Sequence, residues 1–333
     1  MCKLIFPHDN YIFDTHTQIQ NKFIDKINNY GTEEALEWLK TVKCNNECSY
    51  PQALSFSWED TGDTEYIFEL SRFTDFSDSY KVTCTKPFLS VCNLRVGEKY
   101  FWRVNGSESK CFYTADNIIR FIKIDGAMNV RDVGGNKIRQ GLIYRGSDLS
   151  TLYKISENGK KVFTDMLKIK TEVELRKECA DVTKSSVSDD TTYKWLPYRP
   201  YKEIFESEHR KGVCDIMDFL SDERNYPMYI HCLGGADRTG MIALFLRALA
   251  GENDDFIHLD YELTSLSTYA YGLGEVGNDN GFRSRNHSYY QEMMTMLDVY
   301  APGKTLHEKV KLFLFECGVT EECIERIKTI ICK

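Results

Sequence analysis

The stretch from Met228 to Leu246 constrains the fold of this chain more than any other. Met228–Ile230 is a short apolar run typical of a buried strand, and the residues after Thr239 are mostly apolar, as at the start of a buried helix. Between them, Gly234 and Gly235 form a loop whose backbone can turn sharply and approach a ligand closely. The first N–H groups of a helix lack internal partners, so a strand, a glycine loop and a helix start together predict an anion site.

Cys232 opens this loop and Arg238 closes it. A thiol near a helix N-terminus and a guanidinium loses its proton more easily, because both stabilise the thiolate. The thiolate is the nucleophile, and the planar fork of Arg238 can hold two oxygens of a phosphoryl group. We therefore expect phosphoryl transfer to Cys232 followed by hydrolysis. Arg238 and the loop amides would neutralise the phosphate, so we expect no metal and no other cofactor.

His231-Cys232, five residues and then Arg238-Thr239-Gly240 resemble the signature loop of the cysteine-dependent phosphatases. The ending Asp-Arg-Thr-Gly is similar to one branch, the bacterial and fungal tyrosine phosphatases known as tyrosine phosphatase family 3. The resemblance implies a phosphocysteine intermediate, Thr239 as hydroxyl donor to the departing thiolate, and His231 as a structural support. The residues implied to bind phosphate are Leu233, Gly234, Gly235, Ala236, Asp237, Arg238 and Thr239. The alternative is a buried structural cysteine before an ordinary helix.

Two upstream segments resemble motifs of the same branch. Asn129–Gly135 is similar to its Phe-Arg-Asp-Leu-Gly-Gly, and Leu142–Leu149 is similar to its Arg-Ser-x-x-Leu. On the residues alone, Arg131 and Asp132 could equally form a solvent ion pair or a turn. The resemblance implies that Arg131 and Asp132 line the phosphate site and that Arg145 supports it.

The leaving oxygen needs a proton, so one general acid is expected. Some members of the branch carry an aspartate shortly after a Leu-Pro-aromatic segment, but residues 196–201 of this chain contain none. Asp237 is the first candidate for the acid, and Asp132 is the second. Glu203 or Glu206 could serve if their loop folds over the site. Asp237 could instead bond the amides of its own loop.

The interior of the loop bears on the substrate. Related phosphatases that act on phosphoinositides often carry lysines there, which balance additional phosphates. Ala236 stands where this branch frequently has lysine. We therefore expect a protein-tyrosine phosphatase that acts on phosphotyrosine-containing proteins. The alternatives are a phosphoinositide phosphatase and a catalytically weak phosphate-binding protein.

The C-terminal part of the chain, 116–333, reads as an α/β domain. Strand-like runs fall near 119–124, 142–145, 171–175, 193–198 and 228–231. Helical patterns between and after them indicate a central sheet flanked by helices, which the resemblance makes a cysteine-phosphatase fold. A ligand loop directly after a strand suits the carboxyl end of such a sheet. Residues 265–286 lack periodicity and predict a surface loop or a flap near the site.

The N-terminal part predicts two further segments. Residues 1–48 contain two short helices, broken at Gly31. Residues 49–115 predict a small all-β sandwich from short alternating runs: Ala53–Trp58, Tyr66–Ser71, Ser79–Thr85, Phe88–Val91, Tyr100–Val104 and Cys111–Tyr113. Trp58, Leu94-x2-Gly97-x2-Tyr100 and Trp102 resemble a fibronectin type III domain, with those aromatics in the core. We expect this sandwich to dock a protein partner; a β-rich extension of the catalytic domain is the alternative.

Composition excludes some classes of function. The net charge of -8 over 333 residues argues against a nucleic-acid-binding protein and gives no general attraction to anionic membranes. The first residues lack an apolar core of signal-peptide length, and no run is long enough to span a bilayer. We therefore expect a soluble cytoplasmic protein, with Cys44 and Cys48 as free thiols.

Overall fold

The computed structural model describes residues 2–42, 47–268 and 282–333. The chain divides into two units: a β-rich unit, Met1–Thr17 with Tyr50–Lys123, and an α/β unit, Gln18–Ser49 with Ile124–Lys333. This division differs from the predicted boundaries at 48 and 115, because the segment 1–48 is shared between the two units. Its first part pairs with strands of the β-rich unit, and its helices belong to the α/β unit.

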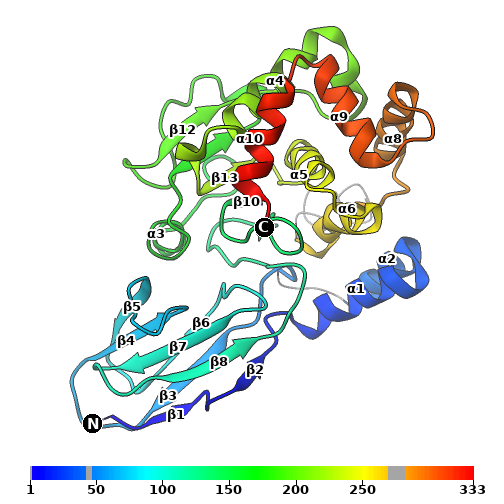
Figure 1. Cartoon of the computed structure of the whole chain (residues 1–333). Helices are drawn as coiled ribbons and strands as arrows, with labels where there is room; N and C mark the ends of the chain where they lie inside the picture. Colours follow the sequence, from blue (N-terminus) through cyan, green and yellow to red (C-terminus); the bar gives the residue numbers. More distant parts are fainter. Residues whose placement is uncertain (1, 43–46, 269–281) are drawn as a thin grey trace. The chain divides into compact units, whose positions relative to one another are not determined.

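The β-rich unit contains two sheets (Figure 1). The first has the order β1 (Leu4–Phe6), β3 (Leu54–Trp58), β6 (Phe88–Val91). The second has the order β2 (Tyr11–Phe13), β8 (Lys110–Thr114), β7 (Lys99–Val104), β4 (Tyr66–Ser71), β5 (Ser79–Cys84). All six predicted strands are present. Strands β1 and β2 were not predicted, because three residues are too few to show an alternating pattern.

Phe56 joins the two sheets of this unit. Its fully buried ring lies 4.9 Å from Phe68, 5.2 Å from Trp102 and 5.6 Å from Phe112, all at edge-on angles. Such angles suit the charge distribution of aromatic rings. Because the three partners belong to the second sheet, the two sheets face one another as a sandwich. The aromatic residues predicted as core are buried: Trp58, Tyr100 and Trp102.

The predicted strand over 119–124 is wrong, since no strand of either described sheet includes these residues. Ile119, Phe121, Ile122 and Ile124 are buried, which explains the apolar pattern. Side chains satisfy the local backbone in place of a sheet. The Arg120 guanidinium donates to the Asn93 carbonyl at 2.6 Å, and the Asn93 side chain accepts from the Lys123 amide at 2.6 Å.

The sheet of the α/β unit has the order β12 (Thr192–Trp195), β11 (Thr171–Glu174), β13 (Met228–His231), β10 (Ile143–Gly146), β9 (Arg131–Asp132). The first four strands are parallel, and β9 is antiparallel to β10. Every residue of the central strand β13 is buried. His231 is level with Gly146 on one side and Glu174 on the other. The loop after β13 therefore leaves at the carboxyl edge of the parallel strands, where α/β proteins bind ligands.

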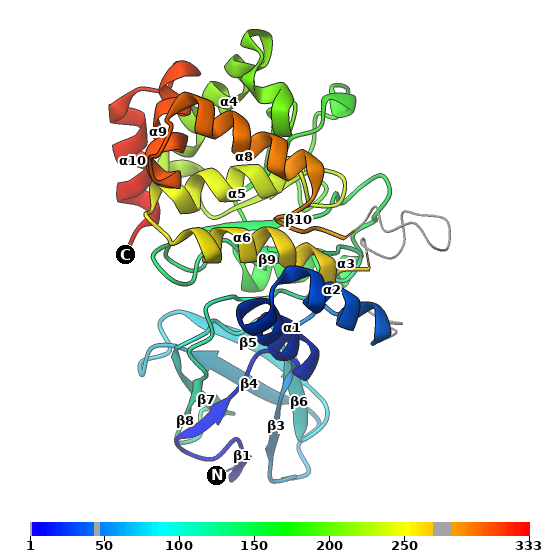
Figure 2. The same ribbon diagram turned by 90° about the vertical axis from the view of Figure 1, so that its right-hand side faces the viewer.

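Helices cover this sheet (Figures 1 and 2). On one side lie α5 (Arg238–Leu249), α6 (Asp254–Glu262), α8 (Ser288–Tyr300) and α9 (Leu306–Glu316), and α3 (Glu157–Lys161) lies on the other. Helix α4 (Ser207–Leu220) contacts α9 and α10 (Glu321–Ile331). α1 (Gln18–Tyr30) and α2 (Thr32–Thr41) break at Gly31, as predicted. The Thr32 hydroxyl donates to Glu262 of α6 at 2.6 Å.

The structure bears on the expectations about membrane spans and free thiols. No helix within the described ranges is both long and apolar enough to cross a bilayer. Cys48 is disulfide-bonded, so the expectation of a free thiol there is wrong, and Cys44 lies outside the described residues. Disulfides are rare in reducing compartments, so the cytoplasmic location stays a prediction only.

Phe56→Ala should lower the unfolding free energy of the β-rich unit by about 3–5 kcal/mol, the usual cost of removing a buried Phe side chain. Phe88→Ala is the matched control, because Phe88 lies on the neighbouring strand β6 with 56% of its surface exposed. Urea unfolding of the full chain, followed by tryptophan fluorescence, measures both. Equal losses for the two variants would contradict the packing described for Phe56.

Candidate active site

The loop that joins β13 to α5, residues 232–238, holds the predicted nucleophile. Cys232 follows the last residue of β13 and has 4% of its surface exposed. Helix α5 begins at Arg238 and runs for 12 residues, with Asp237 at its N-cap. The Gly240 and Met241 amides donate to the carbonyls of Ala236 and Asp237 at 3.0 Å. The loop therefore lies at the positive end of a helix dipole.

The carbonyl groups of this loop point outward. Three consecutive carbonyls accept hydrogen bonds from outside the loop: Leu233 from the Asp148 amide at 3.0 Å, Gly234 from the Asn129 side chain at 3.0 Å, and Gly235 from the Arg145 guanidinium at 2.7 Å. In a planar trans peptide the carbonyl and the following N–H point in opposite directions. The next three N–H groups are therefore directed toward the inner side of the loop, where they can bind an oxyanion.

Gly235 is where the loop approaches strand β10 most closely. Its φ is +66°, and a Cβ built there would lie 2.4 Å from the backbone carbon and oxygen of Gly146. Any side chain at this position must displace the backbone of the loop or of the strand. Glycine is therefore required for the outward turn of these carbonyls.

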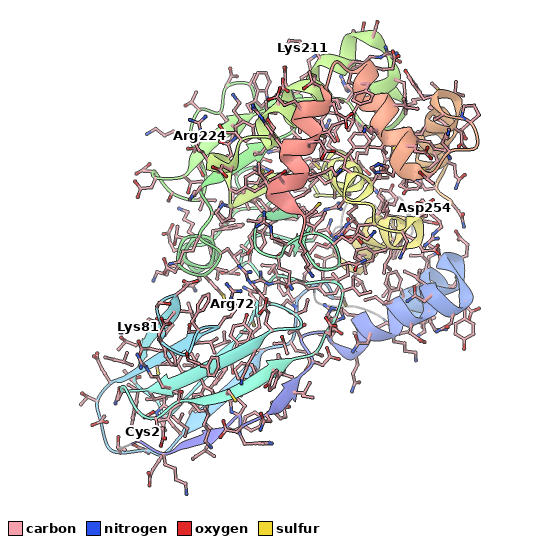
Figure 3. The ribbon with its side chains drawn as sticks, viewed as in Figure 1. Cys2, Arg72, Lys81, Lys211, Arg224 and Asp254 are labelled. Carbon is pink, nitrogen blue, oxygen red and sulfur yellow. The ribbon has the colours of Figure 1, made fainter. Side chains whose placement is uncertain are left out.

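Basic side chains of this unit include exposed and fully buried ones. Lys211 and Arg224 project from its outside (Figure 3) and pair with carboxylates close in sequence. Arg131, Arg145 and Arg247 are instead buried, with 1%, 1% and 0% of their surface exposed. Buried guanidinium groups need charged or polar partners to offset their lost hydration, and Asp260 of α6 supplies one.

Asp260 lies between these arginines. Arg131 Nε donates to Oδ1 at 2.9 Å, Arg145 pairs with Oδ2, and Arg247 Nη2 lies 3.4 Å from Oδ1. Burial by itself would raise the pKa of Asp260, but the three guanidinium charges outweigh it and hold that pKa far below its usual range. Burial and the charge of Arg145 lower the pKa of Arg131 to about 10. The cluster fixes Arg145, which in turn holds the loop.

Arg131 and Asp132 were predicted to line the phosphate site, and the structure gives them supporting places. Arg131 is buried and donates to Asn129 Oδ1 at 2.5 Å and to the Asp260 carbonyl at 2.6 Å. Asn129 in turn donates to the Gly234 carbonyl of the loop. The Asp132 carboxylate accepts the Gly134 and Gly141 amides at 2.8 and 2.7 Å. Both of its oxygens therefore serve the backbone, which makes a second role as proton donor unsuitable.

His231 is the last residue of β13 and directly precedes the loop. Its ring is buried, with Nε2 3.0 Å from Glu172 and Nδ1 3.6 Å from Glu174. Burial alone would lower the pKa of His231, but the hydrogen bond to Glu172 and the charge of Glu174 outweigh it and raise that pKa. Arg176 forms an ion pair with Glu174 at 2.7 Å.

Arg238 and Thr239 retain unsatisfied donors. Arg238 Nε and Thr239 Oγ1 are buried and have no hydrogen-bond partner among the residues that the structure describes. Arg238 Nη2 lies 4.0 Å from Glu178, which is a weak contact. Buried donors are normally satisfied. An oxyanion in the loop would give both groups a partner, which agrees with their predicted roles.

Asp237 is tied into an ion pair. Arg283 Nε and Nη2 donate to its two oxygens at 2.8 and 3.0 Å, and the Tyr201 hydroxyl donates to Oδ1. Burial by itself would raise the pKa of Asp237, but Arg283, Tyr201 and Arg238 outweigh it and lower that pKa. A carboxylate held in this way is a poor proton donor. The geometry therefore opposes the predicted role of Asp237 as general acid.

Glu203 and Glu206 are the remaining acid candidates. They line a cavity of about 740 Å³ whose wall also includes Asp237, Tyr201 and Tyr289. Within the described ranges, one group of acidic and imidazole side chains is compact enough to hold a metal ion: Glu206, Glu208 and His209. Both glutamates are exposed, and exposed acidic groups are common without a metal.

Sequence reasoning assigned no role to several residues that shape the site: Asn129, Glu172, Tyr201, Asp260 and Arg283. The motif around Asn129 was noted, but it did not show which side chain would reach the loop. Tyr201 is the last residue of the segment 196–201, which lacks an aspartate. Arg283 lies in the stretch 265–286, of which residues 269–281 fall outside the described ranges.

Gly235→Ala should lower kcat/KM for an aryl phosphate by roughly 10²–10³-fold, the loss that follows removal of a transition-state hydrogen-bond donor. The added Cβ displaces the loop amides. Gly251→Ala is the matched control, because Gly251 also has a positive φ, of +71°, but meets only the Lys137 ammonium at 3.5 Å. Comparable losses of activity in both variants would show that backbone strain alone matters.

Asp260→Asn should destabilise the protein by about 3–5 kcal/mol, because it leaves buried guanidinium charges without a partner. The folded-state pKa of Asp260 is depressed, so its contribution is present above the unfolded pKa of about 4 and is lost as the pH falls. Asp255→Asn, on the exposed side of the same helix, is the control. Urea unfolding should show a higher free energy of unfolding for the wild type at pH 7, and the difference from Asp260→Asn should narrow below about pH 4. A difference that does not change with pH would contradict the role given to Asp260.

Comparison with known proteins places this geometry in a family. A family model described as "Tyrosine phosphatase family" matches residues 122–333, and no curated protein matches the sequence. Among solved structures, the chain is similar to the core catalytic domain of the PP-IP phosphatase SIW14 from S. cerevisiae, in complex with citrate. The two are 15% identical over 49% of this chain and 91% of that chain, with a TM-score of 0.28. On the family match, which spans most of the chain and includes the whole signature loop, this protein belongs to the tyrosine phosphatase family and is a cysteine-based phosphatase.

Proposed function

We propose that this protein is a protein-tyrosine phosphatase that hydrolyses phosphate monoesters through a phosphocysteine intermediate on Cys232. One observation carries the proposal. The outward carbonyls of the loop direct consecutive N–H groups toward its inner side, and the unsatisfied Arg238 Nε belongs to the same loop. Cys232 opens this loop, so its sulfur and an oxyanion cradle come from one segment.

The chemistry follows in two steps. In the first, the Cys232 thiolate attacks phosphorus, the S–P bond forms, and the P–O bond breaks with its electron pair on the leaving oxygen. The loop amides and Arg238 stabilise the charge on the non-bridging oxygens. In the second, water attacks phosphorus and the S–P electron pair returns to sulfur. The Thr239 hydroxyl, which lacks a partner in the described structure, can donate to that thiolate.

The cavity beside the loop supports an aromatic substrate. Its walls include the rings of Tyr201 and Tyr289, whose centroids lie 5.8 Å apart. Asp237 belongs both to the loop and to the cavity wall. Ala236 adds no positive charge for a second phosphate. These features favour phosphotyrosine over a phosphoinositide.

We also infer that the β-rich unit is a fibronectin type III-like domain that docks a protein partner. Its three-stranded and five-stranded sheets and the buried Trp58 and Trp102 support this inference. Phe88 and Ile12 expose 56% and 67% of their surface, and exposed apolar side chains of this kind can contribute to an interface.

Cys232→Ser should abolish turnover of a chromogenic aryl phosphate and of a phosphotyrosyl peptide, because the hydroxyl is a much weaker nucleophile. Arg238→Lys should lower kcat by roughly 10²–10³-fold, since a point charge cannot replace the planar fork. Cys214→Ser, a free thiol on α4, is the control and should keep full activity. Phosphate release is the measurement.

Three outcomes would contradict the proposal. Turnover by Cys232→Ser would exclude the phosphocysteine mechanism. Faster phosphate release from phosphoinositide vesicles than from phosphotyrosyl peptide would contradict the substrate class. Binding of a phosphotyrosyl peptide without release of phosphate, over the whole pH range where the protein is folded, would show a phosphate-binding protein.

A further inference from the structure

Arg283 engages the only carboxylate within the signature loop. Its Nε and Nη2 donate to Asp237 Oδ1 and Oδ2 at 2.8 and 3.0 Å, a two-point pairing that fixes direction as well as charge. Arg283 is 6% exposed, and the Tyr201 hydroxyl donates to the same Oδ1. A carboxylate that accepts three donors in a buried place is stabilised without its proton.

The segment that carries Arg283 is itself held on several sides. The Arg283 amide donates to the Ser265 hydroxyl at 2.9 Å, and that hydroxyl donates to the Arg283 carbonyl at 2.9 Å. The next residue, Ser284, donates to Glu33 of α2 at 3.1 Å. Glu33 lies outside residues 122–333 of the family match. The N-terminal helices therefore help to seat the partner of a loop residue.

The other groups that face Asp237 do not reverse this charge balance. Arg238 at the start of α5 adds a further positive charge. His287 lies before α8, and burial and Arg283 lower its pKa, so its ring is neutral at pH 7. Burial raises the pKa of Tyr198 and of Tyr201 well above 10, so both phenols stay protonated. Tyr261 of α6 reaches Asp237 through Tyr201, at 2.7 Å between hydroxyls.

We propose that Arg283 is a positioning residue that keeps Asp237 as a carboxylate and thereby restricts the enzyme to phosphate esters with acidic leaving groups, such as aryl phosphates. The proposal rests on the function proposed above. It names Arg283 as a determinant of specificity for that same site and assigns Asp237 to the second step of the reaction.

The charge state of Asp237 affects the two chemical steps differently. When the S–P bond forms and the P–O bond breaks, Asp237 is held as a carboxylate by Arg283 and does not protonate the leaving oxygen. A phenolate, whose conjugate acid has a pKa of about 10 as in tyrosine, can leave without that proton, but an alkoxide cannot leave readily. When water then attacks the phosphocysteine, Asp237 accepts the water proton, the P–O bond forms, and the S–P electron pair returns to Cys232.

A series of aryl phosphates of increasing phenol pKa, ending in an alkyl phosphate, tests this directly. In the wild type, kcat/KM should fall steeply along the series. Asp237→Asn should change kcat/KM by a similar small factor for every ester. It should lower kcat, and a rapid burst of phenolate should precede slow turnover because phosphocysteine hydrolysis becomes limiting.

Arg283→Gln should weaken the dependence of kcat/KM on the pKa of the leaving group. Asp237 can then carry a proton, so kcat/KM for the alkyl ester should rise relative to the best aryl ester, approaching the roughly 10²–10⁴-fold that a general acid contributes. This gain should disappear at alkaline pH and in the double variant with Asp237→Asn. Lys211→Gln, which removes an exposed cation from α4, should leave the slope of the series unchanged.

One result would overturn the inference even if Arg283→Gln does not fold. If Asp237→Asn in the otherwise native chain slows the alkyl ester roughly 10²–10⁴-fold while sparing the best aryl ester, Asp237 is the acid and Arg283 does not silence it. Trapping of phosphate on Cys232 by rapid acid quench keeps the two proposals apart. If the alkyl ester is slowed and phosphate is found on Cys232, only the Arg283 inference is refuted. If no phosphate is found on Cys232, the phosphocysteine mechanism is refuted.

Discussion

The pairing of the Asp260 carboxylate with buried guanidinium groups is the interaction on which the signature loop depends. Arg145 spans the distance between this carboxylate and the loop, donating to Asp260 with one nitrogen and to the Gly235 carbonyl with another. Without the carboxylate, Arg145 would have no reason to remain buried. The outward turn of the loop carbonyls, and with it the inward direction of the amides, therefore begins at α6 rather than in the loop itself.

Two further ion pairs set the charge around the sulfur. Directly before the loop, Glu172 and Glu174 stabilise the protonated form of the buried His231. At the other end of the loop, Arg283 stabilises the charged form of Asp237, which removes an acid from the site. The second pair limits what the nucleophile can displace. A loop of seven residues thus receives its chemistry from side chains on distant parts of the chain.

The sequence predicted the elements of this fold better than the partners of its site. The strand at 228–231 and the helix after Thr239 followed from apolar patterns, and the loop between them followed from its glycines and its two reactive side chains. The run 119–124 shows why patterns fail, because burial alone produces an apolar run, and Arg120 and Asn93 then replace the sheet hydrogen bonds. Arg131 and Asp132 were predicted to line the phosphate site, but their orientation depends on other partners. Arg131 is held by Asp260, 129 positions away, and Asp132 by the Gly134 and Gly141 amides. No local pattern links Arg283 to Asp237, since 46 positions separate them.

The proposed chemistry requires a Cys232 thiolate next to loop amides that bind an oxyanion. Alkylation of Cys232 by iodoacetamide, located by mass spectrometry against the other cysteines, tests this most directly when vanadate is present or absent. The account predicts rapid labelling of Cys232 at neutral pH and its suppression by vanadate, while the remaining thiols respond to neither condition. Labelling of Cys232 only under alkaline conditions, and at a rate that vanadate does not change, would contradict it.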